Sequence, residues 1–233
     1  ATKELTDPPY ELVRILGELP ALPVPPIPGS LGLDINELNL RAVSLRALRL
    51  DATTDGQSWT IGDATATLPG PTTLHLSGAL TTAGERPSFA GKLSLASNRL
   101  DVLAGLWRKQ PPDNPLFGVT GALSGSVTLS GDTLAVADGK LSLNGLDQSF
   151  AAEIGFGQPR RLKLVAHVTS IGAEESAALG ALLPEIGANG SFGATFPKGE
   201  LDLSASAATL FGLAGADLAA KANWEGGVVE FSE

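Results

Sequence analysis

The amino-acid sequence predicts a mainly β protein, an antiparallel sheet made from repeated strand units with a few short helices. Three observations predict this fold class. Apolar and polar residues alternate with a period of two from Leu31 onward, turn-forming pairs separate the alternating stretches, and the chain resembles itself at an offset of 170 positions.

Strands are expected wherever one face of a stretch is apolar and the other polar. Leu48 and Leu50, for example, alternate with Arg49 and Asp51. The same alternation recurs around Leu74 and Leu76, Phe89, Leu93 and Leu95, Leu123, Val127 and Leu129, Leu141 and Leu143, Leu162, Leu164 and Val168, and Leu201 and Leu203. Turns are expected at Asp55-Gly56, Ser130-Gly131-Asp132, Asn144-Gly145 and Lys198-Gly199. Together these signals indicate about twelve strands.

A short amphipathic helix is expected near the N-terminus. It begins after Thr6-Asp7, where a capping side chain is followed by prolines in the first turn. It ends before a proline-rich stretch from Pro20 to Pro28, in which missing amide donors favour an extended chain. We interpret that stretch as a stiff connector, in preference to a ligand for a proline-recognising domain.

Two further helices are expected between strands. Ser97-Asn98 is a suitable cap for a helix that carries Leu100, Leu103, Leu106 and Trp107 at helical spacing. Ile171-Gly172 leads into another helix, which has acidic residues in its first turn and stops at Pro184. Both helices should be short.

The internal similarity extends over the beginning and the end of the chain. Displaced by 170 positions without a gap, Leu33 falls on Leu203 and Gly56 on Gly226, so the phase of the strands and an acidic-Gly turn are kept. We therefore predict a short helix and Pro-rich connector in residues 1–30, a first β unit with a terminal helix in 31–110, a second such unit in 111–186, and the start of a third in 187–233.

Composition excludes some classes of partner. The 233 residues carry a formal net charge of −9, which argues against a nucleic-acid backbone or an anionic membrane surface as the main partner. The absence of cysteine excludes disulfides, thiolate metal sites and cysteine nucleophiles. With no initiator Met, no secretory signal and no apolar run of membrane-spanning length, the chain is expected to be a segment of something longer.

The sequence predicts no catalytic site, no metal site and no cofactor. The two histidines, His75 and His167, each stand inside an alternating strand without a ligand-like neighbour, so we interpret them as solvent-facing strand residues. One alternative function is that of a carbohydrate-active protein that uses carboxylates at turns. The carboxylates in question are Asp51, Asp55, Asp63, Asp132, Asp138 and Asp147, which suit the polar side of a sheet better.

The apolar face is then the remaining candidate for function. A long antiparallel sheet needs its apolar side covered by a second sheet, by helices or by an apolar ligand. Three short helices supply too little surface for this many strands. The sheet is therefore expected to fold over on itself, to bury a core between its halves, or to leave an apolar groove.

A stretch from Leu31 to Trp107 resembles the repeating unit of AsmA-type proteins of Gram-negative bacteria. The similarity lies in LDINELNL, in the strand LRALRLDA, in the turn Asp55-Gly56 followed by Trp59-Thr60-Ile61, and in PSFAGKLSL, which leads to LDVL. Looser similarity covers Gly118 to Leu183, and Leu201 to Glu233 is similar to the start of another unit.

The resemblance implies a function in lipid transport. AsmA-like and TamB proteins, with the bridge-like lipid-transfer proteins, are thought to form an elongated, curved antiparallel sheet, the β-groove or β-taco, with an apolar concave side. They are typically anchored in the inner membrane, reach through the periplasm and support outer-membrane biogenesis by moving phospholipid or other lipids. By this resemblance the chain is expected to be a periplasmic, non-enzymatic segment that is attached to the inner membrane through a part outside these residues, with lipid acyl chains and membrane proteins as partners.

The apolar phase of the strands then predicts which residues line such a groove. They are Leu48, Leu50, Leu74, Leu76, Phe89, Leu93, Leu95, Val127, Leu129, Leu141, Leu143, Leu162, Leu164 and Val168. The helix residues Leu100, Leu103, Leu106 and Trp107 are expected to plug or cap it. The alternative is a structural or chaperone-like β module for outer-membrane biogenesis, whose sheet closes on itself and which recruits a protein partner by strand addition.

Overall fold

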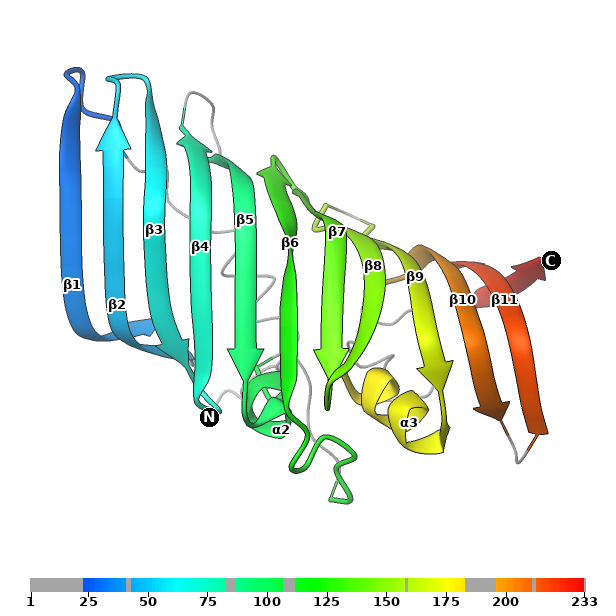
Figure 1. Cartoon of the computed structure of the whole chain (residues 1–233). Coiled ribbons are helices and arrows are strands. Elements are labelled where there is room, and N and C mark those ends of the chain that lie inside the picture. The colour runs from blue at the N-terminus through cyan, green and yellow to red at the C-terminus, as the bar shows by residue number, and fades with distance from the viewer. Residues whose placement is uncertain are drawn as a thin grey trace, which may run out of the picture.

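The described residues form one open sheet of 12 strands in the order of the sequence (Figure 1). The computed structural model describes residues 23–40, 43–82, 87–106, 112–157, 159–182, 196–210 and 213–232. The predicted N-terminal helix and the connector as far as residue 22 lie outside this part of the chain. The expected mainly β class with about twelve strands is confirmed.

Each strand except the last has 10 to 13 residues. The strands are β1 (Gly29–Leu40), β2 (Val43–Thr54), β3 (Ser58–Leu68), β4 (Thr72–Thr81), β5 (Ser88–Ser97), β6 (Gly121–Ser130), β7 (Thr133–Leu143), β8 (Leu146–Gly155), β9 (Arg161–Ile171), β10 (Lys198–Leu210), β11 (Leu213–Glu225) and β12 (Val228–Ser232). The helices are α2 (Leu100–Ala104) and α3 (Ala173–Leu182).

Both helices follow a strand that ends on the same side of the sheet, the lower side in Figure 1. We call that side the helix rim and the other side the opposite rim. Helix α2 has Arg99 as its N-cap residue, and the Ser97 hydroxyl accepts the Arg99 amide at 3.2 Å. In α3 the carboxylate of Glu175 accepts the Gly172 amide at 3.0 Å, which satisfies a backbone donor at the helix start.

The sheet is not wholly antiparallel, which corrects one detail of the prediction. Strand β10 pairs with β9 in parallel, whereas every other pair of described neighbours is antiparallel. A parallel neighbour needs a crossover, and the segment from α3 to β10 returns the chain to the opposite rim. Lys198-Gly199, expected to be a turn, is instead the first residue pair of β10, beside Arg161 and Leu162 of β9.

The internal similarity corresponds to equal geometry. The hairpin of β1 and β2 pairs Leu33 with Leu50, and the hairpin of β10 and β11 pairs Leu203 with Ala220, which is the same pair displaced by 170 positions. The two hairpins also share a kink. Ala47 and Asp217 occupy matching positions and have left-handed backbone conformations, with φ of 48° and 52°.

The chain before each hairpin is also placed alike. A Cβ on Gly56 would lie 3.2 Å from the carbonyl oxygen of Pro26, and the amide of the matching Gly226 donates at 3.0 Å to the carbonyl of Pro197, one position beyond the match of Pro26. Strand β10 therefore begins a second copy of the arrangement that begins at β1, after a period of nine strands. The predicted unit boundaries at 110 and 186 remain a prediction, because the sheet continues through both.

Candidate functional site

The predicted lining residues share one face of the sheet. Directly paired residues of neighbouring strands point to the same side. Leu50 pairs with Ala64 of β3, which pairs with Leu76, and Leu76 pairs with Leu93. The same linkage runs on to β9 through the pairs Phe89 with Leu129, Leu123 with Leu141, Val136 with Ala152, and Ala152 with Leu164. We call this side the apolar face.

Local irregularities keep leucines on the apolar face. A strand with strict alternation would turn all later apolar residues to the other side after an extra residue. Register shifts occur between Ile61 and Ala64, and between Val136 and Gly139. At each shift the strand carries one additional residue, as in a β-bulge, and the apolar residues on both sides of it face the same way.

Most of the lining residues are half-buried rather than enclosed. Leu48, Leu50, Leu74, Leu162 and Leu164 are partly exposed, although each lies between strands on both sides. Phe89, Val127, Leu129, Leu143 and Val168 are buried. The apolar face is therefore packed laterally along the sheet, and leucines in its middle keep part of their surface accessible.

The described helices cover only the helix-rim end of the apolar face. Leu100 and Leu103 of α2 are buried in one cluster with Leu143 of β7 and with Ala178 and Ala181 of α3. Leu95, Leu106 and Leu141 pack against this cluster. The structure thus brings the predicted cap residues Leu100, Leu103 and Leu106 together at one end, while Trp107 lies outside the described residues.

A second apolar cluster lies over the middle strands, away from the helices. It is formed by Phe89, Val127 and Leu129, and the partly buried residues around it are Ile61, Leu76, Leu80, Leu93, Leu134, Val136 and Phe156. The ring of Phe89 lies over Gly91, where a Cβ would be 2.6 Å from Cζ of that ring. The glycine therefore makes room for the aromatic side chain within the face.

Several residues of the apolar face were not predicted as lining residues. They include Leu31, Leu33 and Ile35 of β1, Trp59 and Ile61 of β3, Leu134 and Val136 of β7, Phe150 and Ile154 of β8, and Leu201 and Leu203 of β10. The interrupted alternation at the bulges hid those of β3 and β7. The signal that could have found the residues of β1 and β10 is the internal similarity, since Leu31 and Leu33 match Leu201 and Leu203.

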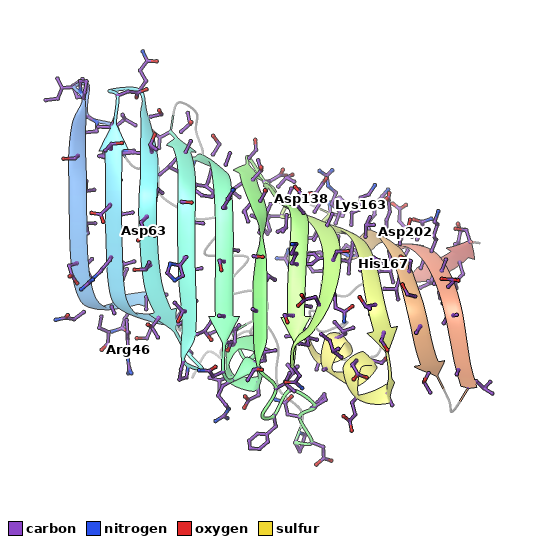
Figure 2. All side chains as sticks on the ribbon, viewed as in Figure 1. Arg46, Asp63, Asp138, Lys163, His167 and Asp202 are labelled. Atoms are coloured by element: carbon purple, nitrogen blue, oxygen red, sulfur yellow. The ribbon has the colours of Figure 1, made fainter. Side chains whose placement is uncertain are left out.

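The polar face carries the charged and histidine side chains. Figure 2 labels six of its polar residues, among them Asp63, Asp138, Lys163, His167 and Asp202. His167 is exposed and lies 2.9 Å from the Ser204 hydroxyl across the strand pair, and His75 is exposed as well. Both histidines take the solvent-facing positions expected for them.

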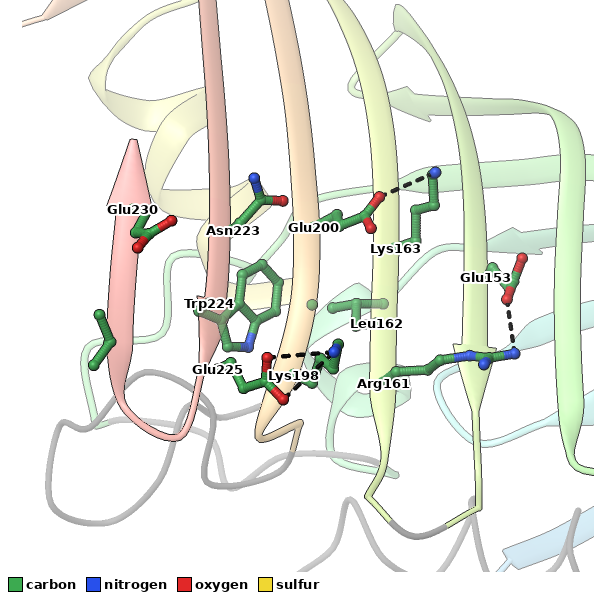
Figure 3. A pocket seen from close by; sticks show the side chains of 12 residues that line it. Glu153, Arg161, Leu162, Lys163, Lys198, Glu200, Asn223, Trp224, Glu225 and Glu230 are labelled. Carbon is green, nitrogen blue, oxygen red and sulfur yellow. Dashed lines mark hydrogen bonds and ion pairs between the residues drawn. The ribbon is translucent and has the colours of Figure 1, made fainter. Parts of the chain in front are cut away.

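A shallow hollow of about 610 Å³ lies on the polar face over β8 to β12 (Figure 3). Six of its seven charged residues form ion pairs: Arg161 lies 3.2 Å from Glu153, Lys163 lies 3.0 Å from Glu200, and Lys198 lies 3.3 Å from Glu225. Glu230 is the seventh and leaves the hollow with one excess negative charge. The hydrogen bond with Glu200, together with its negative charge, raises the pKa of Lys163. Because these groups neutralise one another in cross-strand pairs, they stabilise the pairing of neighbouring strands and offer little net charge to a ligand.

Metal-ligand clusters and membrane-spanning helices are both absent from the described ranges. No group of three or more His, Asp or Glu residues in this part of the chain is arranged to hold a metal ion. In the same residues, no helix has the length and hydropathy that a bilayer crossing requires.

The chain was compared with models of known protein families, with curated protein sequences and with solved structures. None of the three comparisons found a match.

Proposed function

We propose that the apolar face binds lipid acyl chains, and that the chain is a periplasmic segment of an AsmA-like protein that supports lipid transfer between the inner and outer membranes. The observation that carries this proposal is the continuous apolar face, with half-buried leucines on most of its strands, across an open sheet whose described helices cover only one end. In the proposal the chain is attached to the inner membrane through a part outside these residues.

The energetics favour an elongated apolar ligand. Each methylene group removed from water contributes about 0.8 kcal/mol. The middle of the face offers aliphatic side chains on successive strands, as in the pairs Leu50 with Ala64, Leu76 with Leu93 and Ala152 with Leu164. Contacts of nearly equal strength along the sheet would hold a chain without fixing it at one site, which suits transfer.

The charges of the protein are compatible with this arrangement. Arg49, Lys92 and Lys163 point to the polar face, because their paired residues Asp34, Ser77 and Glu153 lie there. In the proposal acyl tails contact the side chains of the apolar face, and polar headgroups remain in water at a rim of the sheet.

The test compares two adjacent residues that face opposite sides. Leu164→Asp puts a carboxylate on the apolar face, whereas Val165→Asp puts it on the polar face, where Val165 is 43% exposed. With a dansyl-labelled fatty acid as probe, Leu164→Asp is expected to weaken binding by about 1–3 kcal/mol, roughly five- to a hundredfold, because the charge must be desolvated against the tail. Val165→Asp should bind as the unchanged chain does.

Leu50→Asp repeats the test at the other end of the face, with Thr53→Asp on the polar side as its control. Circular dichroism must show the same fold for all four variants. Equal binding by the two members of each pair, or no binding by the unchanged chain, would refute the proposal. Native mass spectrometry of gently purified protein adds a probe-free check, since copurifying lipid is expected.

A further inference from the structure

The free edge of β1 presents an unpaired strand of unusual length. Within the described residues β1 pairs with β2 on one side only. It has 12 residues, and its charged side chains are Asp34 and Glu37. Exposed edges in natural sheets are normally short, proline-bearing or rich in lysine, since they otherwise pair with another strand. β1 is long and contains neither proline nor lysine.

The matching edge inside the sheet is occupied. Strand β10 repeats β1 at an offset of 170 positions, with the same register to its hairpin partner and the same left-handed kink in that partner. On its other side β10 carries β9, in parallel, from Arg161 to Ile171. The structure therefore contains one example of what lies against this type of edge.

The apolar side chains of β1 are more exposed than the matching side chains of β10. Leu31 and Leu33 are 37% and 39% exposed. Their counterparts on β10, Leu201 and Leu203, are half-buried beside β9, and Leu203 packs against the cluster that contains Val168. Leu179 of α3 packs against the same cluster, so β10 has both a neighbouring strand and a helix residue beside it, and within the described residues β1 has no neighbouring strand on that side.

We propose that the free edge of β1 binds an extended protein segment in parallel, with apolar side chains at every second position as in β9. This inference concerns an edge of the sheet and is independent of the lipid proposed for its face. Transferred from β10, the register places Leu164 of such a strand beside Leu31, Ala166 beside Leu33 and His167 beside Asp34. The segment would add an apolar row to the apolar face and continue the backbone ladder.

The probe is a peptide with the sequence of Arg161–Ile171, added in excess to the whole chain. Hydrogen exchange is the readout. The peptide should slow the exchange of β1 amides by about tenfold or more, because opening of an edge strand then requires loss of a second ladder. Amides of β12, at the other edge, should change less than about twofold, as should all amides with a peptide of equal composition in which apolar and polar positions are exchanged.

The register is tested with a charge pair. A peptide with His167→Lys should bind the unchanged chain about two- to fivefold more tightly, the size of an exposed cross-strand ion pair, although Asp34 also lies 3.4 Å from Arg49. That gain should vanish with Asp34→Asn, which removes the charge from an exposed side chain.

Three results would overturn the proposal. One is exchange in β1 that the peptide does not slow. Another is a gain from His167→Lys that persists in Asp34→Asn, which would indicate another orientation or register. The last is β1 already protected in a dimer of the free chain, seen by light scattering, which would make a second copy the occupant.

Discussion

Replacing Gly91 with alanine tests how closely the strands of the apolar face approach one another. Gly91 of β5 pairs with Gly78 of β4, so two glycines stand opposite each other. A Cβ on Gly91 would overlap the carbonyl oxygen of Ser77, would lie 2.8 Å from the Cα of Gly78 and would lie 2.6 Å from Cζ of Phe89. Two of these three atoms belong to backbone, which cannot rotate away.

The expected cost of Gly91→Ala follows from those contacts. Overpacking of a close-packed site costs about 1–3 kcal/mol, and separating the strands weakens at least one ladder hydrogen bond, worth about 0.5–1.5 kcal/mol. The expected loss is therefore about 2–4 kcal/mol in the free energy of unfolding. For a chain of this length, that lowers Tm by roughly 4–16 °C.

The assay is thermal and urea unfolding followed by circular dichroism. Gly29→Ala is the matched control, because a Cβ there meets no atom within 4 Å and the position also lies in a strand. It should leave Tm unchanged or slightly raised. If Gly91→Ala unfolds within a degree or two of the unchanged chain, the strands do not approach as closely as described, and the reasoning fails.

Two further predictions concern α2. Leu103→Ala should lower the free energy of unfolding, measured in urea, by about 2–4 kcal/mol, because Leu103 is only 5% exposed within the helix cluster. Val102→Ala is the control on the same helix and should cost less than about 1 kcal/mol, because Val102 is 38% exposed. The hydrogen bond from Arg99, at 2.7 Å, lowers the pKa of Asp101. This interaction stabilises the fold above the carboxyl pKa of the unfolded chain, about 4, and the stabilisation is lost as the pH falls through the lower pKa of the folded chain. The Tm of the unchanged chain should therefore drop more steeply from about pH 5 to pH 3 than the Tm of Asp101→Asn. Parallel curves of Tm against pH would contradict this.

Much of the fold follows from period-two alternation, and the exceptions have local causes. Leu74 and Leu76 alternate cleanly, as do Leu93 and Leu95, and these pairs face each other as expected. In β7 the alternation breaks before Gly139, where a register shift inserts an extra residue, so the pattern alone did not place Leu134 or Val136 on the face. Bulges depend on partner strands, which one strand's sequence does not contain.

The parallel pair was beyond the sequence pattern for a different reason. Lys198-Gly199 has the composition of a hairpin turn, and alternation is the same in parallel and antiparallel strands. Only the path of the chain between α3 and β10 decides the direction. Similarly, the alternation identified the lining residues as a set, but the packing of α2 and α3 decided that Leu95, Leu141 and Leu143 meet helices.

The parallel pairing of β9 and β10 also determines at which rim the helices of a following period would lie. The period has nine strands, an odd number, so a purely antiparallel chain would start its next period upside down and would place the next helices at the other rim. The crossover restores the starting direction. A sheet extended by this rule keeps all its helices along one rim, whatever its length. If the apolar face binds lipids as proposed, a headgroup placed at one rim stays at that rim from the first period to the last.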